Sequence, residues 1–332
     1  MKKLFLSLVA VLMTATATFA QSSVLATLSH DGEISTFYGA TALRDAHNAA
    51  ADGDIITLSS GTFVSVNITK AITLHGAGME VNAALQIEPT VITGDFTINI
   101  PDTVTSRLTI EGIYNNHTIS YSGTLKNATF IKDRFKKVTN GNGTLKNATF
   151  IHCRIAENLY LTSNSSASCV NCVVWYPHSG DGSTSNFEFQ NCVIKGSNLS
   201  NIYSSSFKNC ILLNDNRYYG YLESSCIAYN CVGIGNSEMF KSMPNQTNVM
   251  KGFSEVFKTL TGETYNDSEN FELTEEAQKS LLGIDGTQVG IYGGNMPFNS
   301  TPTNPQITKC HVAAKSTADG KLSVDITVNG AE

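Results

Sequence analysis

The chain has 332 residues, of which 41% are hydrophobic and only 15% are charged. Disordered chains combine few apolar residues with a high net charge, so this composition excludes extended disorder. The formal net charge is −6 at pH 7, and an acidic surface argues against a nucleic-acid partner, because phosphate binding needs a clustered basic face.

The first twenty residues have the pattern of a secretory signal peptide. Two lysines follow Met1, residues 4–13 form an apolar core, and residues 18–20 (Thr-Phe-Ala) offer a small-residue cleavage site. The alternative, a membrane anchor, is disfavoured because the apolar run is too short to span a bilayer. We predict a signal peptide over residues 1–20 and export to the periplasm, the cell surface or the medium, with no membrane insertion after cleavage.

A short capping helix is predicted over residues 38–53. Leu43, Ala46 and Ala50 fall on one face of this helix, and Gly53 can end it. A helix at this place would cover the first coil of a solenoid, where an open strand edge would otherwise pair with another chain.

The main signal in the chain is an internal repeat with a period near 20 residues. The segment GTLKNATFI at residues 123–131 recurs at residues 143–151, and degraded copies follow as far as residue 232. This period, with many β-branched residues and no helical periodicity, is typical of one turn of a β-solenoid. Leucine-rich repeats share the period, but their Leu-x-x-Leu-x-Leu framework is missing.

Aligning the copies on a recurrent asparagine predicts which residues share a column of the solenoid. The aligned residues are Asn127, Asn147, Asn171, Asn191, Asn209 and Asn230. We expect them at turns between strands, because Asn tolerates left-handed backbone. The next column is small and points inward: Ala128, Ala148, Cys172, Cys192, Cys210 and Cys231. Two further inward columns are Leu125, Leu145, Cys169, Phe189, Phe207 and Ala228, and Phe130, Phe150, Val174, Ile194, Leu212 and Gly233.

Eight cysteines in an exported chain raise the question of disulfides. Four of them share an inward column with alanines, which favours buried small side chains with free thiols. Disulfides between neighbouring coils, such as Cys172–Cys192, remain an alternative, because the Cα atoms of adjacent rungs lie within disulfide range. Stacked parallel thiols lack tetrahedral convergence, so no metal site and no other cofactor is predicted.

The repeat is lost after residue 233, and residues 234–283 are predicted to form an irregular excursion and a cap helix. Thr274 can N-cap this helix, with Glu275 and Glu276 in its first turn and Gly283 after it. Residues 301–332 are predicted to form a linker and a β-hairpin.

Three segments carry a resemblance to the right-handed parallel β-helix proteins of the pectate-lyase-like superfamily. Residues 39–63 resemble the N-terminal module of that superfamily, and residues 71–79 (AITLHGAGM) resemble the strand of the following coil. Residues 271–294 resemble the segment with which many exported β-helix domains close. The resemblance implies an all-β fold, a single-stranded right-handed parallel β-helix over residues 21–300, and is nearly silent on activity.

The motifs that make such β-helices catalytic are missing. Lyases of the superfamily bind Ca²⁺ with clustered carboxylates and use Arg or Lys as the base, whereas the hydrolases use several Asp residues. Most glycoside hydrolysis needs two paired carboxylates, yet the regular coils hold only scattered ones: Asp133, Glu157, Asp181, Glu188, Asp215 and Glu223. If the chain were a lyase or hydrolase, its base would be Arg134, Arg154 or His152.

A basic and aromatic strip is predicted along one flank. Aromatic faces stack on sugar rings, and Arg or Lys can hold carboxylates or sulfates. The alternative is an ordinary corner with Trp175 and the tyrosines packed under a loop. The predicted strip consists of Lys132, Arg134, His152, Arg154, Trp175, Tyr176, His178, Lys195, Arg217, Tyr218 and Tyr219. Two further loops, residues 178–182 and 285–287, resemble metal or nucleophile loops but are interpreted as turns, since turns require Asp and Gly.

The sequence therefore predicts a non-catalytic exported protein that binds glycan, an anionic polysaccharide in particular, or acts as an adhesive scaffold. A solenoid offers a long repetitive face that suits extended polymers. Two alternatives stay open. One is a lyase or hydrolase acting on acidic polysaccharide, and the other is a structural module whose hairpin docks a cell-surface protein.

Overall fold

The fold is known from a computed structural model. It describes residues 24–85, 87–180, 184–196, 198–214, 216, 218–243, 247–262, 268–303, 305–312, 319–321 and 323–329. The predicted signal peptide and Arg217 lie outside the described residues.

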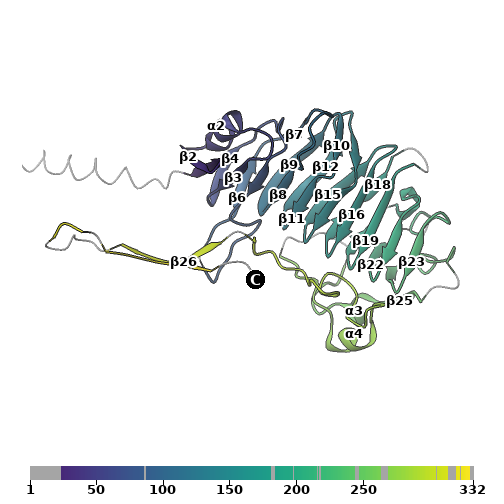
Figure 1. Cartoon of the computed structure of the whole chain (residues 1–332). Coiled ribbons are helices and arrows are strands. Elements are labelled where there is room, and N and C mark those ends of the chain that lie inside the picture. Colours follow the sequence, from purple (N-terminus) through teal and green to yellow (C-terminus); the bar gives the residue numbers. More distant parts are fainter. Residues whose placement is uncertain are drawn as a thin grey trace, which may run out of the picture.

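The chain forms a parallel β-solenoid of about nine turns (Figure 1). Each turn contributes one strand to sheet A and one to sheet B. The parallel strands of sheet A are β3 (Ile55–Leu58), β5 (Thr73–His75), β8 (Thr109–Glu111), β11 (Thr129–Ile131), β14 (Ala148–Ile151), β16 (Ser166–Val170), β19 (Asn186–Gln190), β21 (Ser206–Lys208) and β23 (Ile227–Tyr229).

Sheet B lies beside sheet A and continues one strand further. Its main path consists of β4 (Gly61–Val64), β6 (Thr90–Thr93), β9 (Ile113–Tyr121), β12 (Arg134–Asn140), β15 (Arg154–Leu161), β17 (Val173–Trp175), β20 (Val193–Lys195), β22 (Ile211–Asn214), β24 (Val232–Gly235) and β25 (Val249–Lys251). Two short strands join its side, β7 (Phe96–Ile98) on β9 and β18 (Pro177–Ser179) on β15. A small third sheet pairs β10 (Thr124–Lys126) with β13 (Thr144–Lys146).

The N-terminal end is closed by a hairpin and a helix. Strands β1 (Leu25–His30) and β2 (Glu33–Tyr38) form an antiparallel hairpin that extends sheet A. Helix α2 (Ala42–Ala49) is shorter than predicted, because residues up to Tyr38 belong to this hairpin. The predicted apolar face of the helix is confirmed, since Leu43, Ala46 and Ala50 are buried.

The strand register corrects the predicted columns. Phe130 on β11 pairs with Phe150 on β14, and Phe150 pairs with Cys169 on β16. Asn127 and Asn147 therefore precede a strand of sheet A, whereas Asn171 and the later asparagines follow one. Both corners have a left-handed residue followed by a small inward one, so the asparagine motif fits either corner and the alignment slipped.

The residues that actually stack at the corner from sheet A to sheet B form the corner column. All of them are left-handed, with φ between 50° and 55°. The corner column is Lys132, His152, Asn171, Asn191, Asn209 and Asn230. The inward column after it holds Asp133, Cys153, Cys172, Cys192, Cys210 and Cys231, in place of the predicted alanines.

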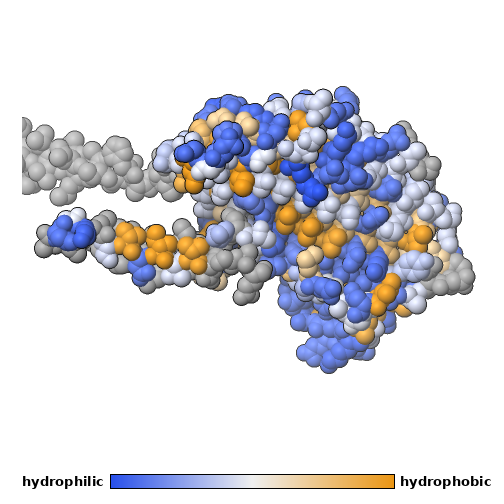
Figure 2. Space-filling view, in the orientation of Figure 1, coloured by the Kyte–Doolittle hydropathy of each residue, from blue (hydrophilic) through white to orange (hydrophobic). Residues whose placement is uncertain are grey.

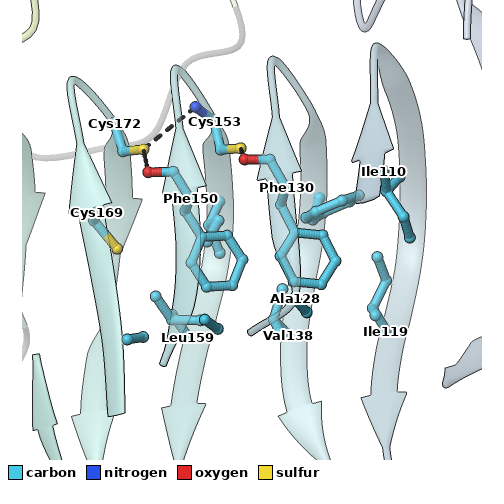
Figure 3. Close-up of a cluster of buried hydrophobic side chains, with 14 of the residues drawn as sticks. Ile110, Ile119, Ala128, Phe130, Val138, Phe150, Cys153, Leu159, Cys169 and Cys172 are labelled. Carbon is cyan, nitrogen blue, oxygen red and sulfur yellow. Dashed lines mark hydrogen bonds between the residues drawn. The ribbon is translucent and has the colours of Figure 1, made fainter. Parts of the chain in front are cut away.

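The stacked aromatic rings of the core follow the corrected register. Phe130 and Phe150 stack with ring centroids 4.7 Å apart (Figure 3). Phe189 and Phe207 stack in the same way at 5.2 Å, two coils further on. Identical side chains in successive coils thus pack on each other, because neighbouring rungs lie about 4.8 Å apart.

The buried thiols satisfy backbone groups at the corner. The N–H of Cys153 donates to Sγ of Cys172 at 3.3 Å, and the Cys172 thiol donates to the Phe150 carbonyl (Figure 3). The same N–H to sulfur contact recurs from Cys172 to Cys192. A buried N–H without a partner would cost about 1–3 kcal/mol. In the earlier coil, Asp133 Oδ1 accepts the corresponding hydrogen bond from the Ile113 N–H. The cysteines are therefore hydrogen-bonding residues as well as small core residues.

The described thiols are free and buried, which answers the question of disulfides for seven of the eight cysteines. Burial raises the pKa of Cys153, Cys192 and Cys231 well above the ordinary value of a thiol. These groups stay protonated and can donate to the carbonyls of the turn.

The chain after β25 folds back along the solenoid (Figure 1). We call residues 253–303, apart from the undescribed 263–267, the clamp. It begins with two short helices, α3 (Phe253–Val256) and α4 (Glu275–Ser280). The predicted N-cap is confirmed, because Thr274 Oγ1 accepts from the Ala277 N–H at 3.1 Å. Among the described helices, none is long and apolar enough to cross a membrane.

Candidate functional site

The clamp covers the outer face of sheet B and forms a second hydrophobic core there. This core is separate from the one inside the coils. Trp175 lies at its centre, 1% exposed, with its ring centroid 5.7 Å from that of Phe271 in the clamp. The outward residues of sheet B in this core are Val173, Trp175, Val193, Ile211, Leu213, Val232 and Ile234.

The last part of the clamp, residues 281–303, forms a strap along the corner column. It runs from the last coils back toward the first ones and meets the corner residues in reverse order. Asn209 Oδ1 accepts from the Ile284 N–H at 3.0 Å, and Asn171 Nδ2 donates to the carbonyls of Ile291 and Gly293 at 2.7 and 2.8 Å. Further on, His152 Nε2 bonds the Met296 carbonyl and Lys132 Nζ the Thr301 carbonyl.

The strap lies so close that side chains would not fit at some of its positions. A Cβ at Gly294, where φ is 77°, would lie 2.2 Å from Asn191 Nδ2. Residues 285–287 form the turn that was predicted, since the Thr287 N–H and hydroxyl both donate to Asp285 Oδ1. Of residues 178–182, the structure describes only 178–180.

The clamp buries much of the predicted strip. Arg154 donates from Nη1 to the Glu269 carbonyl at 2.8 Å, and its guanidinium lies 5.1 Å from the Phe298 ring centroid. His152, Trp175 and Lys195 are buried as well. Burial lowers the pKa of His152, so its ring is neutral at pH 7 and donates from Nε2 to the strap.

The other strip residues lie in different places. Arg134 stacks over the Tyr114 ring at 4.6 Å, and His178 stacks on Tyr160 with centroids 5.0 Å apart. Lys132, Arg134, Tyr176 and His178 are half-buried, whereas Tyr218 and Tyr219 are exposed. The structure does not bring the strip residues together on one exposed surface, and their role in ligand binding stays a prediction.

Glu111 holds the end of the strap. Its buried carboxylate accepts from the Thr303 N–H and hydroxyl, both at 2.6 Å, and from His75 Nδ1 at 2.9 Å. Burial by itself would raise the pKa of Glu111. The hydrogen bonds from His75 and Thr303 outweigh it, so the pKa lies below its ordinary value.

We expect acid to loosen this end of the strap. A carboxylate whose pKa is lower in the folded chain stabilises the fold above its unfolded-state pKa of about 4.3. That contribution is lost as the pH falls through the folded-state value. Glu111→Gln should therefore lower the unfolding free energy at pH 7 and weaken its decline in acid, as measured by urea unfolding at several pH values. The exposed Glu238→Gln serves as the control, and a pH profile of Glu111→Gln equal to that of the wild type would contradict the expectation.

The outer face of sheet A is open and carries a ladder of hydroxyl side chains. Five successive coils place Thr or Ser in one outward column, at a spacing of about 4.8 Å. The column consists of Thr73, Thr109, Thr129, Thr149 and Ser168, followed by Glu188 and Ser206. Beside it lies an apolar column of Ile131, Ile151 and Val170.

A shallow groove of about 340 Å³ lies on this face, across strands β14, β16 and β19. Ser166 Oγ donates to Asn147 Oδ1 at 3.1 Å and accepts from the Asn147 N–H at 2.8 Å, which holds one wall in place. The polar side chains that line the groove are Asn147, Thr149, Ser166, Ser168, Asn186 and Glu188. We take this groove as the candidate functional site.

Sequence reasoning missed the groove, because outward Ser, Thr and Asn look like ordinary exposed strand positions. The signal was the Thr shared by the two verbatim repeats, which the correct register aligns with Ser168. In the part of the chain that the structure describes, no three His, Cys, Asp or Glu side chains are placed to hold a metal ion. Comparisons with protein-family models, with curated proteins and with solved structures returned no match.

Proposed function

We propose that the protein is a non-catalytic, exported scaffold that binds an extended glycan on the outer face of sheet A. The observation that carries the proposal is the groove, where hydroxyl, amide and carboxylate groups from three successive coils face the same depression. Membership of the pectate-lyase-like superfamily is part of the proposal, and the parallel β-solenoid fold supports it.

The lining of the groove favours a neutral glycan over an anionic one. Hydroxyl and amide groups both donate and accept hydrogen bonds, as sugar hydroxyls do. The one charged residue in the lining is Glu188, which would repel a uronate or sulfate. The apolar column of Ile131, Ile151 and Val170 offers a surface for the C–H face of a sugar ring.

The same lining argues against hydrolysis. Glycoside hydrolysis usually needs two carboxylates that flank the scissile bond. The groove contributes Glu188 alone, so binding is the activity that its residues support.

A glycan array with neutral, uronic and sulfated polymers tests this proposal on the mature protein. The best ligand is then titrated by calorimetry against Ser168→Trp, which fills the groove. We expect binding to weaken at least about tenfold, or 1.4 kcal/mol. Thr139→Trp, on the outer side of β12 and away from the groove, is the matched control and should bind like the wild type.

Two outcomes would contradict the proposal. Ser168→Trp with unchanged affinity and an unchanged unfolding midpoint would move the site elsewhere. Release of unsaturated or reducing sugar from the ligand would show an enzyme.

A further inference from the structure

The C-terminal hairpin stands away from the solenoid and carries an uncovered apolar row. Strand β26 (Gln306–Val312) pairs with β27 (Val324–Asn329) in a two-stranded sheet, as predicted. Figure 1 shows this ribbon projecting from the body, and Figure 2 shows hydrophobic residues along it. Val324, Ile326 and Val328 are 52%, 51% and 50% exposed and alternate with polar residues, so they share one face.

A ribbon of this kind needs another strand. Two-stranded hairpins are marginally stable in water, whereas three or more strands with a hydrophobic face are stable. No further strand pairs with β26 or β27 in the described parts of the chain.

The two edges of the ribbon differ in their readiness to pair. The register of β26 shifts between Ile307 and Lys309, which marks a bulge. Bulges are devices that blunt an edge. Strand β27 contains a single charged residue, Asp325, and its edge is the one suited to pairing.

We propose that β27 pairs with β27 of a second copy of the chain, giving a symmetric dimer with a four-stranded sheet. With Ile326 on the twofold axis, Val324 lies opposite Val328 of the partner subunit, and Asp325 lies opposite Thr327 of the partner subunit. This antiparallel register keeps the apolar residues on one face and separates the two Asp325 carboxylates. A twofold interface needs such a self-complementary surface, and β27 has one.

The oligomeric state of the full mature chain tests the proposal. Sedimentation over a range of protein concentrations should show a reversible dimer. Ile326→Lys places two ammonium groups at the axis and should give a monomer, with an unfolding midpoint of the solenoid equal to that of the wild type. Ile34→Lys is the matched control, because Ile34 lies on strand β2 and is 72% exposed, and it should remain dimeric.

Cross-linking tests the register. Cys310 lies opposite Ile326 within the hairpin, so Cys310→Ser is introduced first. Ile326→Cys in this background should form a covalent dimer with diamide, which takes two electrons and two protons from the pair of thiols. Val324→Cys should not, because the two Val324 Cα atoms would lie about 14 Å apart, beyond the reach of a disulfide. A chain that is monomeric at every concentration, or that cross-links at Val324 in preference to Ile326, overturns the proposal.

Discussion

Replacing Trp175 with alanine is expected to lower the free energy of unfolding by about 3–5 kcal/mol. The indole is 1% exposed and fills the space between sheet B and the clamp, against Phe271. Its removal leaves a cavity that the neighbouring side chains of two separate segments cannot close completely. Unfolding in guanidinium chloride, followed by far-ultraviolet circular dichroism, measures the loss.

Tyr218→Ala is the matched control for this prediction. Tyr218 belongs to the same predicted strip but is 80% exposed, so its removal should change stability by no more than about 0.5 kcal/mol. If Trp175→Ala kept the stability of the wild type and abolished glycan binding, the strip would be the binding surface, and the clamp would have to leave it.

Trp175→Ala should also show which part of the structure loses stability. The core under the clamp is separate from the core inside the coils, so the clamp can open while the solenoid stays folded. Limited proteolysis of Trp175→Ala should then cut first within residues 253–303. Simultaneous cleavage throughout the solenoid would mean that the two cores unfold together.

The fold class was predictable because every coil of a solenoid repeats the same sequence pattern. The period near 20, the left-handed asparagines and the alternation of inward residues all describe a single coil, and each copy adds evidence for it. The helix that covers the first coil and the N-cap at Thr274 follow from equally local rules, and both were confirmed. The register between the verbatim repeats and the later copies was predicted wrongly, because the two corners of a sheet A strand have the same local chemistry.

The clamp could not be predicted from the repeat, because its residues follow the last coil and contact strands as many as 192 positions earlier, as Thr303 does with Glu111. One signal for it does exist in the sequence. In the correct register, the outward column of sheet B reads Arg134, Arg154, Val173, Val193, Ile211 and Val232. A strand that is apolar on both faces is covered on both, so the change from arginine to valine marks where the apolar core under the clamp begins. The predicted alignment was out of register, so it did not show this column, and it assigned Trp175 to the exposed strip although the side chain is buried.

A second large effect on stability is expected from substitution of Asn171, which bonds to the strap. Its amide donates to the carbonyls of Ile291 and Gly293, and both hydrogen bonds are buried. Asn171→Gly keeps the left-handed backbone at no steric cost and removes only the amide. We expect it to lower the unfolding free energy by about 1–3 kcal/mol, since a buried acceptor is left without a donor. Asn171→Ala should lose about 1 kcal/mol more, because alanine is strained at a φ of 50°.

Asn191 provides the comparison, because it occupies the same column with a φ of 52° and is equally buried. Within the described structure, its side-chain amide has no hydrogen-bond partner, and it packs against Gly294 of the strap. Asn191→Gly should therefore be the milder change, and the difference between the two glycine variants isolates the hydrogen bonds of Asn171 to the strap. Equal losses in the two variants would mean that the Asn171 bonds contribute nothing beyond packing, and that the strap is held by the apolar core around Trp175 and by its other hydrogen bonds.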